Sequence, residues 1–364
     1  MNIAFYGSSI LSSYWNGAAT YYRGLIRALA ALGHRVTFLE PNAFGRQERR
    51  DIEPPDWCDV VVYPASDEGV ARASCWARMA DVVVKASGVG THDDALLEMT
   101  MAAARPDAIR IWWDVDAPAT LASLRTDPKA ALHRLLPALD SVIVYGGGQE
   151  VCGEYVAFGA RRCFPIYNGI DPETHFPAPT DRRFEADLGF LGNRLPDREA
   201  RVEEFLFVPA RQAPERRFLL SGAGWDDAVL PANVRHLGHV GTGDHNAFNS
   251  TPRAILNVNR ESMARRGYSP PTRVFEAAAA GACVITDAWE GIAAFFAPGK
   301  EILVARDGQD VLDLLAGLTG TGAREIGRRA RDRVLADHTY ARRAREVDAL
   351  FRRLLTDRQK VLAA

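Results

Sequence analysis

The chain has 364 residues, of which 47% are hydrophobic and 25% are charged. This composition is typical of a soluble globular protein with a large core, and it excludes a disordered or fibrous chain. At about 100–200 residues per domain, the length predicts two domains. The formal net charge of -2 gives no general attraction to nucleic acid. We therefore expect no nucleic-acid partner and favour a small-molecule ligand.

The sequence carries no signal for a membrane or for export. No stretch approaches the roughly 20 apolar residues of a membrane-spanning helix, and residues 1–6 lack the basic segment and long apolar run of a signal peptide. We expect a cytoplasmic protein with no transmembrane segment. The five cysteines are scattered and contain no CxxC pair, which argues against a disulfide framework or a thiolate zinc site.

The first part of the chain predicts strands that alternate with helices. It opens with a strand, a glycine and serine loop, an amphipathic helix and a second strand, at residues 3–6, 7–17, 18–32 and 35–39. Further short β-rich runs occur at residues 59–63, 81–86, 109–113 and 141–145. This alternation predicts a parallel, doubly wound sheet.

A proline-rich stretch over residues 165–179 interrupts this pattern and is typical of a linker. The pattern then restarts, with strands predicted at residues 187–192, 217–220, 254–258 and 282–286. From residue 322 onward the sequence is helical and rich in arginine. Two successive α/β domains of similar size therefore fit better than one large sheet.

The most informative segment runs from residue 257 to residue 286. A polar loop leads into a helix that begins at Pro271 or Thr272, and Glu276 lies in its first two turns. The helix start offers N–H groups to a diphosphate, and Glu276 can accept hydrogen bonds from a ribose diol. Nearby arginines can neutralise phosphate, namely Arg260, Arg265, Arg266 and Arg273. Alternatively, Glu276 only stabilises the helix N-terminus electrostatically.

The loop after the first strand contains Gly7, Asn16 and Gly17. Small residues at a strand end, before a helix N-terminus, favour binding of an anion or a sugar hydroxyl. A tight turn that is needed only for packing is the alternative.

Three further residues of the first half are candidate catalytic groups. Asp114 and Asp116 form an Asp-x-Asp motif at a strand end, where such acids can bind a divalent cation, act as a general base, or cap the helix after Pro118. His92 follows a turn of small residues and is a candidate general base or sugar ligand, with a surface histidine as the alternative.

Three blocks resemble GT-B glycosyltransferases of the family 1/4-like group, most of all the CgeB-type, spore maturation protein-like group. The blocks are residues 168–176, 189–194 and 273–286. The resemblance implies two Rossmann-like domains that face a cleft, with the C-terminal helix crossing back to the first domain. We therefore predict an acceptor-side domain at residues 1–168, joined by the C-terminal helix at 338–364, and a nucleotide-sugar-binding domain at residues 169–337.

The resemblance also implies roles for particular residues. Glu276 would bind ribose, the loop would approach the diphosphate and sugar through Gly267, Tyr268, Ser269 and Thr272, and the cleft would be lined by Gly192, Asn193 and Arg194. The related enzymes often carry a second glutamate eight residues before Glu276, where this chain has Tyr268. Sugar recognition is therefore less transferable than nucleotide binding.

The predicted function is transfer of a sugar from a nucleotide-diphosphate sugar to an unidentified acceptor, which is a glycan, a small molecule or a protein. Because GT-B enzymes need no metal of the Asp-x-Asp type, we expect a metal-independent reaction with no cofactor, and the family 4 likeness favours retention. Two alternatives stay open: a nonenzymatic two-lobed ligand-binding protein, and a nucleotide-sugar epimerase of the same architecture.

Overall fold

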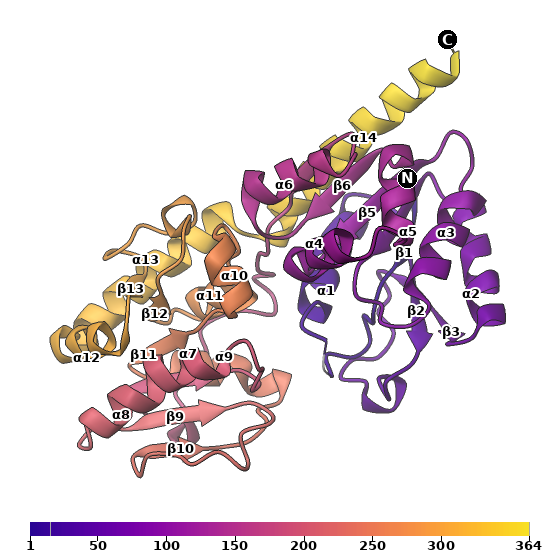
Figure 1. The fold of residues 1–364 in the computed structure, drawn as a ribbon. Coiled ribbons are helices and arrows are strands. Elements are labelled where there is room, and N and C mark those ends of the chain that lie inside the picture. The colour runs from indigo at the N-terminus through magenta and orange to yellow at the C-terminus, as the bar shows by residue number, and fades with distance from the viewer. Residues whose placement is uncertain (15, 364) are drawn as a thin grey trace. The chain divides into compact units, whose positions relative to one another are not determined.

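The computed structural model describes residues 1–14 and 16–363, and the chain divides into two compact units (Figure 1). Unit 1 consists of Met1–Tyr167 and Tyr340–Ala364, and unit 2 consists of Asn168–Thr339. Trp15, in the predicted first loop, and position 364 of the predicted last helix lie outside the described residues. Within the described part of the chain, no helix is long and apolar enough to cross a membrane.

Unit 1 contains a parallel sheet of seven strands in the order β3-β2-β1-β4-β5-β6-β7. The strands are β1 (Asn2–Tyr6), β2 (Arg35–Asn42), β3 (Asp59–Pro64), β4 (Val82–Ala86), β5 (Ile109–Asp114), β6 (Ser141–Val144) and β7 (Cys163–Pro165). The prediction of a parallel, doubly wound sheet is confirmed. The strand β7, which the sequence does not predict, ends at the first residue of the predicted linker, and its three residues form a strand by pairing with β6.

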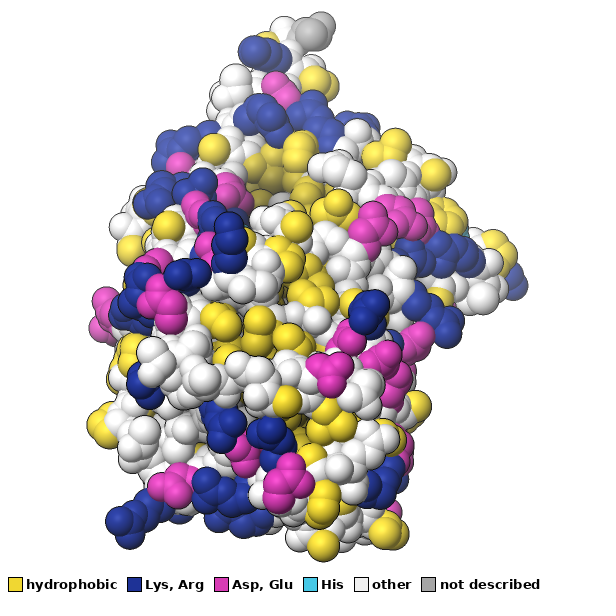
Figure 2. Space-filling view, turned by 90° about the vertical axis from the view of Figure 1, so that its left-hand side faces the viewer, with side chains coloured by type: hydrophobic (Ala, Val, Ile, Leu, Met, Phe, Trp, Pro, Cys, Tyr) yellow, Lys and Arg dark blue, Asp and Glu magenta, His cyan; other side chains and the backbone are white. Residues whose placement is uncertain are grey.

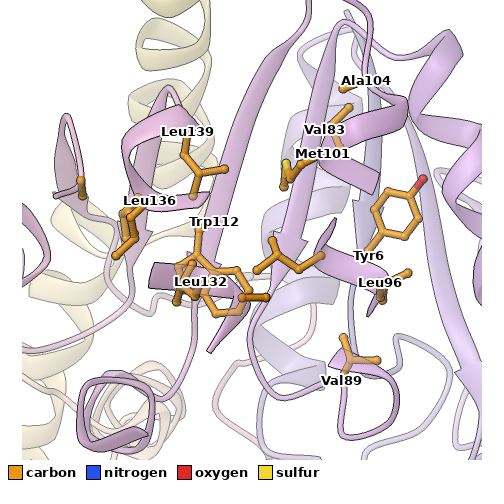
Figure 3. Packing of buried hydrophobic residues seen from close by; sticks show 14 of the residues in the cluster. Tyr6, Val83, Val89, Leu96, Met101, Ala104, Trp112, Leu132, Leu136 and Leu139 are labelled. Atoms are coloured by element: carbon orange, nitrogen blue, oxygen red, sulfur yellow. The ribbon is translucent and has the colours of Figure 1, made fainter. Parts of the chain in front are cut away.

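Helices cover both faces of this sheet. They are α1 (Ala19–Ala31), α2 (Asp67–Ser74), α3 (Asp93–Ala103), α4 (Ala117–Thr126), α5 (Ala131–Leu135), α6 (Gly148–Ala157) and α14 (Tyr340–Ala363). One face packs against α1 and α14, and the other packs against α2 to α6. Figure 3 shows this second face, where Trp112 of β5 lies among apolar side chains such as Met101 of α3 and Leu132 of α5.

The last helix, α14, belongs to unit 1, as the GT-B resemblance implies. It buries Tyr340 and five further apolar side chains against α1 and the sheet. The contact is close, since a Cβ at Gly24 of α1 would lie 2.0 Å from the Tyr340 ring. The helix begins at Tyr340 rather than at the predicted residue 338, because the backbone of His338 and Thr339 pairs with Ile170 of unit 2.

Unit 2 contains a parallel sheet of six strands in the order β10-β9-β8-β11-β12-β13. The strands are β8 (Leu188–Leu191), β9 (Phe218–Ser221), β10 (Val234–His236), β11 (Ala254–Asn257), β12 (Val284–Asp287) and β13 (Leu303–Ala305). The helices are α7 (Glu199–Val202), α8 (Val208–Gln212), α9 (His245–Ser250), α10 (Glu261–Arg266), α11 (Thr272–Ala279), α12 (Gly308–Gly317) and α13 (Gly320–Asp337). A π-helical turn, Glu203–Phe207, joins α7 to α8.

The strand order reverses once in each sheet, between β1 and β4 in unit 1 and between β8 and β11 in unit 2. In open parallel sheets, ligands bind outside the carboxyl ends of the strands at such a reversal, because the loops diverge there and leave a crevice. The predicted site residues Gly7 and His92 follow β1 and β4, while Gly192 and Arg260 follow β8 and β11. The topology thus puts these residues at the sheet edges where ligands are expected.

Candidate functional site

The turn between α10 and α11 in unit 2 is fixed by close packing. Gly267 has a φ of 66°, and a Cβ there would lie 2.7 Å from the Glu290 side chain. Tyr268 has a φ of 43°, and its N–H donates to the Glu290 carbonyl at 2.6 Å. Ser269 is buried, and its hydroxyl donates to the Gly267 carbonyl at 3.0 Å. This turn leads directly into α11, which begins at Thr272 as the sequence predicts.

Glu276 lies in the second turn of α11 and faces His175, from the segment that precedes β8. The carboxylate Oε1 and the His175 Nε2 are 3.6 Å apart, and both side chains are mostly buried. Burial raises the pKa of Glu276, but His175 and Arg273 outweigh burial and lower this pKa to about 2. Burial lowers the pKa of His175, but Glu276 and, to a smaller extent, Asp171 raise it above its ordinary value. Glu276 is therefore ionised at neutral pH, in the state that accepts hydrogen bonds from a diol.

A second cluster of charge surrounds Arg198, in the turn between β8 and α7. Its Nε has no hydrogen-bond partner among the described residues, and its Nη1 donates to the Asn193 carbonyl at 3.4 Å. Burial and the positive charge of Arg273 lower the pKa of Arg198 to about 10, although Asp197 opposes them. Burial likewise lowers the pKa of Arg273. The Arg198/Arg273 pair thus consists of two guanidinium groups that repel each other, and an anionic ligand would relieve this repulsion.

Gly192 leaves the space in which the Arg198 guanidinium lies. The Gly192 N–H donates to the Ser221 carbonyl at 2.8 Å, which continues the pairing of β8 with β9. A Cβ at Gly192 would lie 2.8 Å from the Phe190 ring and 3.1 Å from Arg198 Nη1. The absence of a side chain at Gly192 therefore lets the Arg198 guanidinium lie against the backbone at the strand end.

Three of the predicted arginines have carboxylate partners, and Arg265 pairs with Glu261 within α10 at 2.7 Å. Arg260 Nε donates to Asp197 Oδ2 at 2.8 Å. Arg194 pairs with Glu199 and, at 2.8 Å, with Asp227. The ion pairs of Arg194 and Arg260 hold the turns on which these residues lie. Both guanidinium groups therefore have fewer N–H groups to offer a ligand than Arg198 has.

Asn193 and Arg266 are two further predicted site residues of unit 2. Asn193 accepts the Ala223 N–H on its Oδ1 at 2.9 Å, which fixes the loop after β8. Arg266 lies in the last turn of α10, immediately before Gly267. The structure thus brings the predicted residues of unit 2 to loops at the carboxyl edge of one sheet and to the start of α11.

In unit 1 the loop after β1 is stabilised by hydrogen bonds of the buried Asn16 side chain. Asn16 is buried, its Oδ1 accepts the Ser8 hydroxyl at 2.9 Å, and its Nδ2 donates to the Ser9 carbonyl at 2.8 Å. A Cβ at Gly7 would lie 2.4 Å from the Phe38 ring, whereas a Cβ at Gly17 would meet no atom within 4 Å. Asn16 and Gly7 are therefore required by the loop itself, and their predicted contact with substrate stays a prediction.

His92 ends the turn after β4 with a left-handed φ of 48°. Its Nδ1 lies 3.3 Å from Asp67 Oδ1, and its side chain is partly exposed. The turn is anchored by Lys85, which is fully buried in β4 and pairs with Asp93 Oδ1 at 2.5 Å. The other oxygen of Asp93 accepts the Gly90 N–H at 2.7 Å. The ion pair thus fixes the backbone that presents His92.

Asp114 has a structural environment. It is fully buried and accepts hydrogen bonds from Ser87 Oγ at 2.7 Å, Asp116 N at 2.9 Å, Thr120 Oγ1 at 3.1 Å and the Tyr155 hydroxyl. Burial raises the pKa of Asp114, and these hydrogen bonds oppose the shift. The carboxylate ties β5 to the start of α4, although neither Asp114 nor Asp116 caps this helix with its side chain. The catalytic role predicted for Asp114 and Asp116 stays a prediction.

The described residues contain no group of three or more His, Cys, Asp or Glu side chains arranged to hold a metal ion. On the face shown in Figure 2, the Lys and Arg side chains are interspersed with acidic ones rather than gathered in one continuous basic surface.

Two residues of unit 2 were missed as candidates. Arg198 follows Arg194 in the same strand-end loop, so a survey of all basic residues in such loops would have found it. His175 lies in a block that the resemblance uses, but its role depends on an ion pair with a residue about 100 positions away, which no local pattern shows.

Comparisons with known proteins agree with this architecture. Residues 198–349 match a family described as glycosyl transferase-like, and no match was found among curated protein sequences. Sucrose-phosphate synthase from Thermosynechococcus elongatus has 16% identity and a TM-score of 0.69, over 98% of this chain and 100% of its own. HepE from Anabaena, in complex with UDP and glucose, has 15% identity and a TM-score of 0.70, over 96% and 99%.

A third similar structure is an alpha-glucosyltransferase in complex with UDP-glucose and DNA containing an abasic site. It has 10% identity and a TM-score of 0.72, over 96% of this chain and 98% of its own. At these identities the likeness establishes the fold. The two Rossmann-like sheets with their helices have the GT-B architecture, as predicted.

Proposed function

We propose that this protein is a glycosyltransferase that moves a sugar from a nucleotide-diphosphate sugar to an acceptor, and that unit 2 binds the donor. The Arg198/Arg273 pair carries the proposal, because two guanidinium groups that repel each other, in segments that follow β8 and β11, favour a ligand with several negative charges. The match of residues 198–349 to a glycosyl transferase-like family supports it. Two of the similar structures contain UDP or UDP-glucose, so a uridine diphosphate sugar is the first donor to test.

In the proposed reaction, negative charge grows on the diphosphate as its bond to the sugar breaks. Arg198, Arg273 and the free N–H groups at the start of α11 would stabilise this charge from fixed positions, which lowers the barrier more than it strengthens ground-state binding. Glu276 would accept hydrogen bonds from both ribose hydroxyls. The turn from Gly267 to Thr272 would bring its backbone to the diphosphate and the sugar.

We assign acceptor-side roles to unit 1. His92 and Asp116 are the candidate general bases, because Asp114 already holds four donors within the fold. We further propose a metal-independent reaction that retains the configuration of the sugar. The acceptor, the kinship with CgeB-type proteins and the cytoplasmic location stay predictions.

A panel of nucleotide sugars tests the proposal. Thermal shift with UDP-, GDP- and dTDP-linked sugars identifies the donor, and mass spectrometry of reactions with glycan, small-molecule and protein acceptors detects the transferred sugar. Binding without any turnover would favour a nonenzymatic ligand-binding protein, and interconversion of the donor without an acceptor would favour an epimerase. Binding of none of these compounds would overturn the proposal.

A further inference from the structure

The strand β11 ends at the reversal of the unit 2 sheet, and the reaction proposed above does not use the buried side chain that follows it. Asn259 lies two residues beyond β11, is 1% exposed, and is directly followed by Arg260. Neither its Oδ1 nor its Nδ2 has a hydrogen-bond partner among the described residues. A buried carboxamide left unpaired costs free energy, so an amide in this state beyond the end of β11, where ligands are expected, points to a ligand contact.

The backbone that carries Asn259 is rigidly held. Its N–H lies 3.1 Å and 3.2 Å from the two oxygens of Asp287, at the end of β12. Asp287 is itself fully buried, accepts Arg201 Nη2 at 2.5 Å, and accepts the Thr286 hydroxyl at 3.2 Å. These contacts fix the main chain of Asn259 before any ligand arrives, which reduces the entropy cost of binding.

The chemistry of the carboxamide selects the group that it binds. An amide offers a donor and an acceptor side by side, whereas the oxygens of an ionised phosphate only accept hydrogen bonds and would repel Oδ1. A hydroxyl group both donates and accepts, so a pair of sugar hydroxyls satisfies both atoms. The site lies near the proposed diphosphate position, because Arg260, the residue after Asn259, donates at 2.8 Å to Asp197, the residue before Arg198.

We propose that the Asn259 carboxamide binds hydroxyl groups of the donor sugar and determines which sugar the donor site accepts. This inference rests on the proposed function and adds to it the residue that recognises the transferred sugar. The imide edge of a uracil base also offers a donor and an acceptor. The experiment must therefore separate contact with the sugar from contact with the nucleotide.

Calorimetry with UDP-glucose and with UDP makes this separation. Asn259→Ala is expected to weaken UDP-glucose binding at least tenfold and to change UDP binding less than twofold. An equal loss for both ligands would place the amide on the nucleotide, and no loss for either would remove Asn259 from the site; both results would overturn the inference. If the wild-type protein binds neither compound, the proposed function itself fails for this donor class, and the inference fails with it.

Asn249 provides a matched control. It is also buried, its Oδ1 also has no partner among the described residues, and it lies in the last turn of α9, which leads to the amino end of β11. Asn249→Ala is expected to change the affinity for both ligands less than twofold. An equal effect of the two alanine variants would show a loss of packing rather than a lost ligand contact.

Stability of the ligand-free protein gives a second readout. Asn259→Leu removes an amide that makes no protein hydrogen bond, so the Tm is expected to stay within about 2 °C of the wild type or to rise. A larger fall would mean that the fold itself uses the amide, which would contradict the assignment to a ligand.

Discussion

Replacing Glu276 by Gln tests the ion pair that organises the proposed ribose site. In the folded protein the pKa of Glu276 is lowered from 4.5 to about 2. One pKa unit corresponds to about 1.36 kcal/mol, so the shift is equivalent to about 3 kcal/mol of stability at neutral pH. Because Glu276 is only 15% exposed and His175 only 13%, solvent screens the pair much less than it screens a surface salt bridge.

The pH dependence follows from two shifts of opposite sign. The folded pKa of Glu276 lies below its ordinary value, so its contribution is present above pH 4.5 and is lost as the pH falls toward 2. The pKa of His175 is raised above 6.5, so its contribution is complete below pH 6.5 and is lost as the pH rises through the folded pKa. The pair therefore stabilises unit 2 most strongly between about pH 4.5 and 6.5.

Thermal unfolding of the wild type and of Glu276→Gln at pH 5.5 and pH 3 measures this contribution. At pH 5.5 the variant is expected to unfold about 6–12 °C lower, at roughly 2–4 °C per kcal/mol for a unit of this size. At pH 3 the difference should shrink by more than half. A histidine NMR titration should show the pKa of His175 above 6.5 in the wild type and lower in the variant, because the largest opposition to burial is then lost.

The control is Glu325→Gln, on the surface of α13. Glu325 also pairs with arginine, but it is 44% exposed, so its replacement should change the Tm by less than about 2 °C at both pH values. The reasoning is refuted if Glu276→Gln lowers the Tm equally at pH 5.5 and pH 3, or if the His175 titration is unchanged in the variant.

Three further predictions concern the proposed reaction. Arg198→Ala should weaken UDP binding about 10–100-fold in calorimetry, since a charge-assisted hydrogen bond contributes about 1.5–3 kcal/mol. The control is Arg265→Ala, which should change UDP binding less than twofold because this side chain is 77% exposed. Asp114→Asn should lower the Tm because four donors lose their carboxylate; an unchanged Tm with abolished turnover would instead make Asp114 catalytic. Turnover should be the same in EDTA, and loss of activity that Mn²⁺ restores would indicate that Asp114 and Asp116 bind a metal ion.

Local patterns were sufficient to predict most of the strands. The longer strands of both sheets appear within about three residues of their predicted ranges, because a run of apolar β-branched residues between turn residues is visible in the sequence itself. The start of α11 at Thr272 follows from Pro271, whose ring is compatible only with the beginning of a helix. The short strands β7 and β13 lack such a signal, since three residues become a strand only by pairing with a neighbour.

Some residues of the candidate site could be predicted from the sequence, but their interactions could not. Glu276 and Arg273 were identifiable because they lie at a helix start within one continuous segment. The ion pair of Glu276 with His175, the repulsion between Arg198 and Arg273, and the unpartnered amide of Asn259 join residues from separate elements. The sequence specifies the type of each residue, but the pKa and the hydrogen bonds of a side chain depend on burial and on neighbours in space. Only the order of the strands, with β8 beside β11, decides those neighbours.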